Sequence, residues 1–155
     1  MTRLLILGGS WFLGRAVADA ALLRGWEVTT FRRGQSGADA PGATVVRGDR
    51  TSAADLARLA DAGPWDALVD TSGYVPREVL AVARALEPVV GRYVFVSTVS
   101  VYQDWPTVPL TEDSPVFDLP TRRRSGFRVR RGSWSLGVRL HQGWFRTRCD
   151  SGLRP

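Results

Sequence analysis

The residues best suited to chemistry in this sequence form a glycine-rich segment near the N-terminus. An apolar run, Leu4 to Leu7, is followed over residues 8–14 by Gly-Gly-Ser-Trp-Phe-Leu-Gly. Gly8 permits a tight turn and Gly14 permits close packing of a helix on a strand. The free N–H groups and the dipole of a helix that starts here favour a pyrophosphate. The pattern predicts a phosphate-binding turn, with Trp11 where a third glycine is usual, although similar turns occur in proteins that bind no nucleotide.

Other kinds of site have little support in the sequence. Cys149 is the only cysteine and His141 the only histidine, so neither a disulfide framework nor a zinc site is indicated. No apolar stretch approaches the roughly 20 residues that span a bilayer, and the run at residues 4–7 is too short for a signal-peptide core. We therefore expect a cytoplasmic protein with no membrane partner.

The elements that must position the turn alternate between strands and helices. Apolar residues at helical spacing, among them Phe12, Leu13 and Leu23, predict a helix directly after the turn. Strands are expected at residues 4–7, within 25–31, and at 43–46, 66–70 and 92–97; further helices are expected from Thr51 or Ser52 to about residue 63, with Leu56 and Leu59 buried, and at 76–87. This alternation predicts an α/β fold, a doubly wound parallel sheet of Rossmann type with strand order 3-2-1-4-5.

The composition changes near residue 120. Residues 1–120 hold 11 arginines against 14 acidic residues, whereas residues 121–155 hold 10 arginines against one acidic residue. This second segment has no periodicity. We therefore expect an incomplete domain over residues 1–118, followed by an irregular Arg-rich tail over 119–155 that is disordered or translated out of frame.

Five motifs in order identify a family resemblance. They are the glycine turn, the second strand, Gly48-Asp49, the strand end Asp70-Thr71-Ser72-Gly73, and Val96-Ser97-Thr98-Val99-Ser100-Val101-Tyr102. Over about residues 1–118 the chain resembles the extended short-chain dehydrogenase/reductases, and within them the NAD-dependent epimerase/dehydratase group. The resemblance implies a dinucleotide cofactor, NAD or NADP, and a small-molecule substrate.

The resemblance also implies roles for individual residues. It places around the cofactor pyrophosphate Gly8, Gly9, Ser10, Trp11, Phe12, Leu13 and Gly14. We expect the side chains of Phe12 and Leu13 to pack in the core, which leaves the backbone amides of the turn as the binding groups. Trp11 is expected either to cover the diphosphate or to fill the space of the usual glycine.

Further implied roles fall at the ends of later strands. Asp49 is expected at the adenine ring, although an aspartate there can also cap the following helix. Thr71, Ser72 and Gly73 are expected to line the nicotinamide side. Thr98, with Ser97 beside it, matches the family's catalytic hydroxyl, although serine and threonine at strand ends also cap backbone groups.

The choice between the two cofactors depends on Arg32 and Arg33. They follow the second strand, where an acidic residue binds the ribose 2′-hydroxyl of NAD and an arginine can pair with the 2′-phosphate of NADP. Their presence favours NADP. The alternative is a solvated basic loop that binds no ligand.

One part of the family's chemistry is missing from the sequence. Hydride transfer in the family uses a tyrosine and a lysine in a Tyr-x-x-x-Lys pair, in which the ammonium lowers the pKa of the phenol. This chain contains no lysine: all of its 21 cationic side chains are arginine. An arginine differs in geometry and hydration and does not replace it. The sequence thus favours an oxidoreductase or epimerase fragment that keeps its cofactor half and is catalytically inactive.

A second hypothesis concerns the basic tail. Arginines between residues 122 and 148 are interleaved with Phe127, Trp134, Trp144 and Phe145, a pattern that can contact phosphates and stack on bases. The alternative function is therefore nucleic-acid binding, although nucleic acid is not the partner that the first hypothesis expects.

Overall fold

The computed structural model describes residues 1–35 and 37–117, so the tail hypotheses fall outside the described residues. The chain divides into two compact units, one of residues 1–96 and a second that begins at Ser97. The strands of the first unit are β1 (Arg3–Leu7), β2 (Glu27–Arg32), β3 (Thr44–Arg47), β4 (Ala67–Asp70) and β5 (Tyr93–Phe95), and its helices are α1 (Phe12–Leu23), α2 (Ala53–Asp61), α3 (Pro76–Leu86) and the short 3-10 helix η1 (Glu87–Val89).

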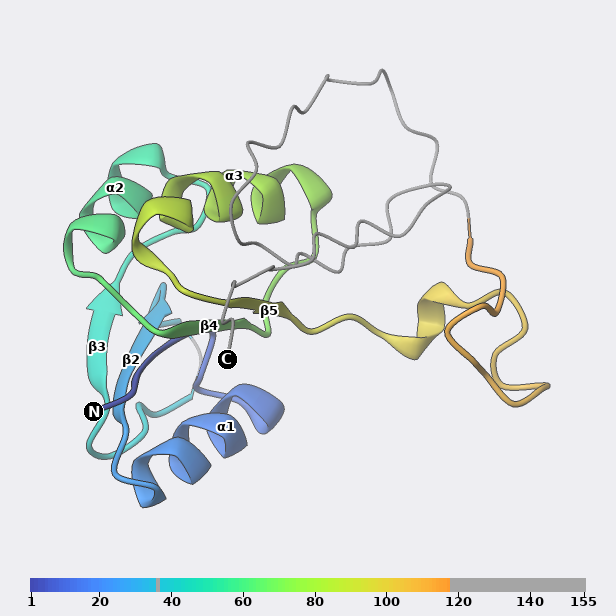
Figure 1. Cartoon of the computed structure of the whole chain (residues 1–155), viewed down its shortest axis with the longest axis horizontal. Coiled ribbons are helices and arrows are strands. Elements are labelled where there is room, and N and C mark those ends of the chain that lie inside the picture. Colours follow the sequence, from blue (N-terminus) through green and yellow to red (C-terminus); the bar gives the residue numbers. More distant parts are fainter. Residues whose placement is uncertain (36, 118–155) are drawn as a thin grey trace, which may run out of the picture. The chain divides into compact units, whose positions relative to one another are not determined.

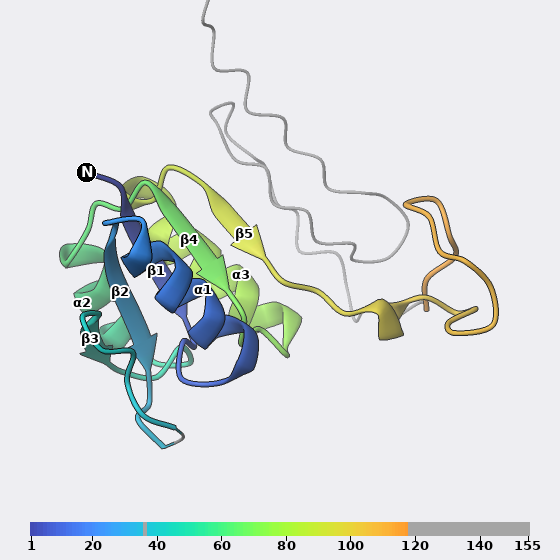
Figure 2. The ribbon, with the colours of Figure 1, turned by 90° about the horizontal axis from the view of Figure 1, so that it is seen from below.

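The strands form one parallel sheet with the order β3-β2-β1-β4-β5. β1 is central and pairs in parallel with β2 on one side and with β4 on the other. Helix α1 covers one face of the sheet, while α2 and α3 lie together on the other (Figure 1), and the strands run in one direction (Figure 2). The predicted fold class and strand order are therefore confirmed.

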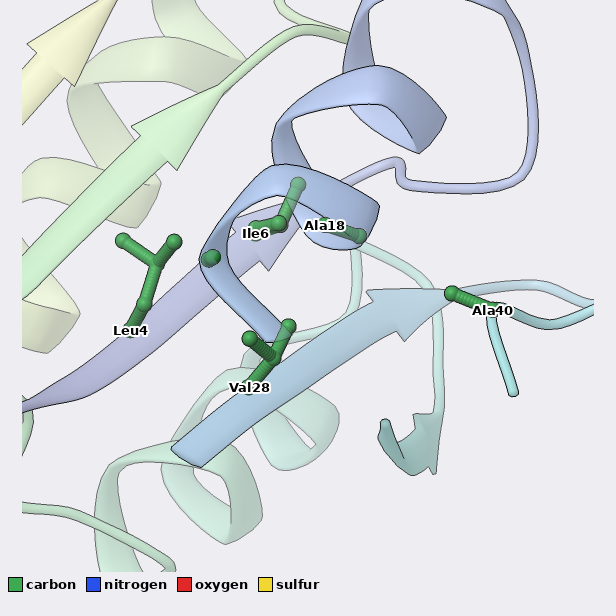
Figure 3. Close-up of a cluster of buried hydrophobic side chains, with 6 residues drawn as sticks. Leu4, Ile6, Ala18, Val28 and Ala40 are labelled. Carbon is green, nitrogen blue, oxygen red and sulfur yellow. The ribbon is translucent and has the colours of Figure 1, made fainter. Parts of the chain in front are cut away.

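The core on the α1 face is built from small and branched side chains. Leu4 and Ile6 of β1 pack against Ala18 of α1 and Val28 of β2 (Figure 3). Alternation along β1 sends Leu5 and Leu7 to the other face, and both are at most 1% exposed. Both faces of the central strand are thus buried, as its continuous apolar run predicts.

The prediction that the side chains of Phe12 and Leu13 pack in the core was wrong. Phe12 is 91% exposed, Leu13 42% and Leu23 89%, whereas Gly14, Ala18 and Ala21 are buried. Residues 14, 18 and 21 share one face of the helix, and their small size lets the helix axis approach the sheet closely. Of the larger apolar residues of α1, Val17 and Leu22 pack against the core, whereas Phe12 and Leu23 point toward solvent.

Helices α2 and α3 follow the sequence prediction closely. Leu56 and Leu59 are the buried residues of α2, and Val79, Val82 and Leu86 are those of α3. Ser52 caps α2: its side chain accepts a hydrogen bond from the backbone N–H of Asp55 at 3.2 Å. Helix α2 follows the loop after β3, and helix α3 follows the loop after β4.

Residues 97–117 belong to the second unit and contain little regular structure. A short 3-10 helix, η2 (Val99–Val101), is followed by turns, and Tyr102 forms an isolated antiparallel bridge with Val116. Residues 104–117 contain turns and bends and no named helix or strand. None of the helices in the described ranges combines the length and the apolarity that a bilayer crossing requires.

Candidate functional site

The turn between β1 and α1 has a backbone that requires glycine. Gly8 has φ 108° and Gly9 has φ 96°, in the region that side chains strongly disfavour. A Cβ at Gly9 would lie 2.8 Å from Cγ2 of Thr30, and a Cβ at Gly14 would lie 2.7 Å from the backbone nitrogen of Gly9. The turn is therefore folded tightly back onto the first turn of α1.

The start of α1 differs from the start of α2. The N-cap of α1 is Trp11, whose side chain provides no capping hydrogen bond, and the first helical turn contains no acidic residue. Helix α2 has both the Ser52 cap and Asp55 in its first turn. Among the described residues, no side chain therefore caps α1, and its first N–H groups and the positive end of its dipole are available to an anion.

The side of the turn is formed by two exposed aromatic residues and a loop. Trp11 is 73% exposed, and Phe12 has a positive φ of 38°, which is uncommon for a bulky residue. A Cβ at Gly37 would lie 2.6 Å from the backbone oxygen of Ser10 and 2.9 Å from Cδ1 of Trp11. The loop after β2 thus packs directly on the turn, and the Trp11 ring lies at the surface.

The residues that follow β4, the strand beside β1, contact the same turn. The hydroxyl of Thr71 donates to the carbonyl oxygen of Leu7 at 3.0 Å. A Cβ at Gly8 would lie 2.5 Å from Oγ1 of Thr71 and 3.9 Å from Oγ of Ser72. The structure thus brings together the predicted residues of the glycine turn and two of the three predicted residues after β4.

A buried ionic network lies beneath this loop. The carboxylate of Asp70, which is fully buried, accepts hydrogen bonds from Nη1 and Nη2 of Arg50 at 3.0 and 2.7 Å, and from the hydroxyl of Tyr93 at 2.7 Å. Arg50 also donates to Oγ of Ser72 at 3.2 Å, and the backbone N–H of Ser72 donates to Asp70 at 3.0 Å. Residues that follow β3 and β4, together with the first residue of β5, are thus tied to one carboxylate.

The protonation states in this network follow from burial and charge. Burial raises the pKa of Tyr93, and the neighbouring Asp70 carboxylate raises it further, so the phenol stays a donor. Burial would lower the pKa of Arg50, but the hydrogen bonds and charge of Asp70 outweigh it and raise the pKa. Nε of Arg50 is buried and has no hydrogen-bond partner among the described residues.

Arg32 and Arg33 have different surroundings. The Arg32 side chain is 8% exposed and pairs with Asp39, to which its Nε donates at 2.6 Å; Arg47 also donates to Asp39, at 2.7 Å. Arg33 is exposed and has no ion pair within residues 1–35 and 37–117. The sequence treats both arginines alike as candidate ligands of the 2′-phosphate. In the structure Arg32 is paired within the protein, whereas Arg33 is exposed.

Asp49 is placed at the end of β3 and serves the local backbone. Its Oδ1 accepts from the backbone N–H and the hydroxyl of Thr51, each at 2.8 Å, and these hydrogen bonds lower the pKa of Asp49. Its own N–H donates to Oδ2 of Asp55 at 2.7 Å. The residue is half-buried, and its predicted contact with adenine stays a prediction.

Ser97 and Thr98 belong to the second unit. Oγ1 of Thr98 accepts a hydrogen bond from the backbone N–H of Ser100 at 3.2 Å and donates to Oγ of Ser100 at 3.3 Å. Thr98 is thus the N-cap of η2, the capping role that the sequence left open. A catalytic role for either residue stays a prediction.

Sequence reasoning missed Arg50 and Tyr93. Arg50 directly follows Gly48-Asp49, and Tyr93 is the buried residue of the apolar strand β5. The available signal was an aspartate at the end of a buried strand, because a buried carboxylate requires donors from its neighbours.

Comparisons with known proteins agree with this geometry. The NAD dependent epimerase/dehydratase family matches residues 4–129. The crystal structure of the Bordetella bronchiseptica enzyme WbmG in complex with NAD and UDP is similar, with a TM-score of 0.64 and 25% identity over 74% of this chain and 43% of that chain. No curated protein matches the chain.

Two further structures show the same fold. WbmH from the same organism, in complex with NAD+, has a TM-score of 0.64 and 24% identity over 77% of this chain and 47% of its own. UDP-glucose 4-epimerase from Bifidobacterium longum, in complex with NAD+ and UDP, has a TM-score of 0.64 and 17% identity over 75% of this chain and 43% of its own. This chain spans less than half the length of these three proteins.

Proposed function

Since the chain belongs to the NAD-dependent epimerase/dehydratase family, we propose that residues 1–96 bind a nicotinamide dinucleotide at the glycine turn. The observation that carries the proposal is the α1 N-terminus, which no side chain caps among the described residues and which follows a turn that cannot accept a Cβ. These are the properties that let backbone N–H groups approach a pyrophosphate closely.

The residues of this chain fit such a ligand. The amides at the start of α1 would hold the pyrophosphate, Asp49 would face the adenine, and Ser72 and Gly73 would face the nicotinamide side. When bound, the cofactor would supply an acceptor or donor of hydride. The family resemblance suggests a substrate of the nucleoside-diphosphate sugar class, in keeping with the UDP present in the WbmG complex.

The choice of dinucleotide would be made by Arg33. Arg32 already neutralises Asp39, whereas the Arg33 guanidinium is exposed at the end of β2, where the ribose 2′ position is contacted in this fold. An arginine can pair with a 2′-phosphate through charge-assisted hydrogen bonds. We therefore retain the preference for NADP and assign it to Arg33 rather than to both arginines.

Catalysis by this chain would be weak. Thr98 and Ser97 offer hydroxyls, but the sequence contains no lysine to complete the family's Tyr-x-x-x-Lys pair. General acid–base help of this kind contributes on the order of 100- to 10,000-fold to rate. The expected result is dinucleotide binding without efficient turnover of carbonyl or sugar-nucleotide substrates.

A pair of variants at Phe12 tests the binding site by charge alone. Phe12 is exposed and has a positive φ, which asparagine and aspartate tolerate better than most residues, so both variants should fold. Phe12→Asp places a carboxylate in the first turn of α1, and Phe12→Asn is its neutral match. The carboxylate stabilises the helix but repels a pyrophosphate.

We expect calorimetric titration to show that Phe12→Asp binds NAD and NADP about 10-fold more weakly than Phe12→Asn. The unfolding midpoint of Phe12→Asp should be equal to or higher than that of Phe12→Asn, because the dipole favours the acid. Equal affinities of the two variants would contradict the proposed site.

A further inference from the structure

We propose that Arg50 is a positioning residue that orients the Ser72 hydroxyl to donate a hydrogen bond to the dinucleotide, an inference that rests on the proposed function. Arg50 follows β3 and Ser72 follows β4, two strands that β2 and β1 separate in the sheet, so the contact joins strand ends that are not neighbours. Nη1 of Arg50 donates to Oγ of Ser72 at 3.2 Å. This contact connects the buried network to the surface of the site.

The Ser72 side chain faces the glycine turn. Its Oγ lies 3.9 Å from the point where a Cβ would stand at Gly8, and its Cβ lies 3.8 Å from the same point. Gly8 cannot carry a side chain there without striking Oγ1 of Thr71 at 2.5 Å. Thr71 thus fills the space beside Gly8, and the half-buried Ser72 hydroxyl lies next to it at the edge of the turn.

The proton of this hydroxyl is available to a ligand. Because Arg50 has no acceptor atom, it can only donate to Ser72 Oγ, which leaves the Ser72 O–H to act as a donor. Its nearest acceptor in the network, Oδ1 of Asp70, lies 3.5 Å away, beyond the normal range for an O–H···O hydrogen bond. A bound acceptor at normal distance would therefore take the proton in preference to Asp70.

The neighbours of Ser72 cannot provide this donor. The Thr71 hydroxyl already donates to the Leu7 carbonyl oxygen at 3.0 Å, and Gly73 has no side chain. A Cβ at Gly73 would lie 2.5 Å from Cε2 of Phe95 and 2.6 Å from Cγ2 of Val79. Within residues 71–73, Ser72 is thus the one side chain that can reach a ligand with a free proton.

The network holds both ends of the contact in place. Asp70 fixes the Arg50 guanidinium through two hydrogen bonds and fixes the Ser72 backbone through its N–H. Donation from Arg50 also polarises the Ser72 O–H and makes it a stronger donor, as in other hydrogen-bond chains. A buried ion pair is weak support for stability by itself, so this arrangement is better explained by the loop that it orients.

The test is a double-mutant cycle in dinucleotide affinity, measured by calorimetry on the full chain. Ser72→Ala removes the donor, and Arg50→Lys keeps a positive charge beside Asp70 but cannot contact both carboxylate oxygens and Ser72. We expect Ser72→Ala to weaken NAD binding roughly 10-fold and Arg50→Lys roughly 5-fold. The double variant should bind like Ser72→Ala alone, and Ser72→Thr, which restores a hydroxyl, should recover most of the affinity.

Val82→Ala is the matched control for lost stability. Val82 is fully buried in α3 and is absent from the network, so its truncation destabilises the domain through a cavity. Its NAD affinity should stay within about 2-fold of the unaltered protein. A structural role of Arg50 alone would make Arg50→Lys behave like Val82→Ala.

Several results would overturn the proposal. Unchanged NAD affinity in Ser72→Ala would show that Ser72 donates no hydrogen bond to the dinucleotide. Additive losses of affinity in the double variant would show that Arg50 does not act through Ser72. If Phe12→Asp weakens binding while Ser72→Ala does not, the inference fails and the proposed function stands. If the unaltered protein binds neither NAD nor NADP, both fail together.

Discussion

Two arginine–carboxylate clusters in this domain use the same chemistry in different surroundings. Asp70 at the end of β4 pairs with Arg50 and is fully buried, and the Arg50 side chain is 13% exposed. Asp39 in the loop after β2 pairs with Arg32 and Arg47 and keeps 34% of its side chain exposed. Water can replace the partners of Asp39 but not those of Asp70.

The difference shows what a carboxylate can do at each position. Exposed ion pairs are screened and add little to stability, whereas a buried carboxylate depends on every donor around it. The Asp70 cluster therefore fixes one arrangement of the β4 loop beneath the site. The Asp39 cluster instead occupies Arg32 and leaves Arg33 as the exposed cation at the end of β2. The predictions below test this contrast.

The largest effect is expected from Asp70→Ala. The substitution leaves Arg50 buried without its counter-charge, and breaking a buried pair from one side costs about 3 to 5 kcal/mol. Urea denaturation should show this loss in the free energy of unfolding. The double variant Arg50→Met with Asp70→Leu should recover much of it, because no buried charge remains. If Asp70→Ala lowered the free energy of unfolding less than Asp39→Ala does, the contrast between the two clusters would be contradicted.

Tyr93→Phe should have the next largest effect. It removes a donor from the Asp70 carboxylate, and a hydrogen bond to a charged group is worth about 1.5 to 3 kcal/mol. Burial raises the pKa of Tyr93 above its ordinary value of 10.0. The contribution of Tyr93 to the free energy of unfolding is therefore complete below pH 10.0. It is lost as the pH rises above this value, because the tyrosine of the unfolded chain then ionises first. Urea denaturation across this pH range should show a weaker alkaline dependence in Tyr93→Phe. An unchanged dependence would contradict this assignment.

Replacing Arg33 should separate the two cofactors. If Arg33 binds the 2′-phosphate, Arg33→Ser should weaken NADP about 10-fold more than NAD, equal to about 1.4 kcal/mol. Arg32→Ser should weaken the two dinucleotides alike, because Arg32 acts on the loop through Asp39. Calorimetric titration of both variants with both ligands measures the ratio. If Arg32→Ser weakened NADP relative to NAD more than Arg33→Ser does, the assignment of the 2′-phosphate to Arg33 would be contradicted.

The smallest effect concerns acid stability. The hydrogen bond from Arg32 lowers the pKa of Asp39 below its ordinary value of 3.8. Its contribution to stability is therefore complete above 3.8 and is lost as the pH falls through the lower folded pKa. Asp39→Asn should slightly reduce the acid dependence of the unfolding midpoint, with high salt reducing the difference further. An acid dependence as large in the variant as in the unaltered protein would contradict this.

The sequence predicted the sheet well because its signals are local. Continuous apolar runs at residues 4–7 and 92–97 and the turn residues between elements specify parallel strands, and handedness then leaves one order. The face of α1 was missed because the helix carries two overlapping stripes, one of large apolar residues and one of Gly14, Ala18 and Ala21. Only the close approach to the sheet selects the small residues.

The site was predicted in part for a related reason. The glycine turn and the Thr71-Ser72-Gly73 segment can be found from spacing, since both follow strands. The contacts of Asp70 with Arg50 and Tyr93 depend on strand register and side-chain reach across three elements, which no local pattern contains. The pairing of Arg32 with Asp39 across the loop was missed for the same reason.

The most direct test of the central claim is to follow the backbone amides of the turn during a titration with NAD. In two-dimensional NMR spectra of the labelled full chain, the account predicts saturable shifts of the amide signals of Phe12, Leu13 and Gly14. The amide of Gly25, at the other end of α1, should not move. Saturable binding that shifts other amides and leaves residues 12–14 unchanged would contradict the account.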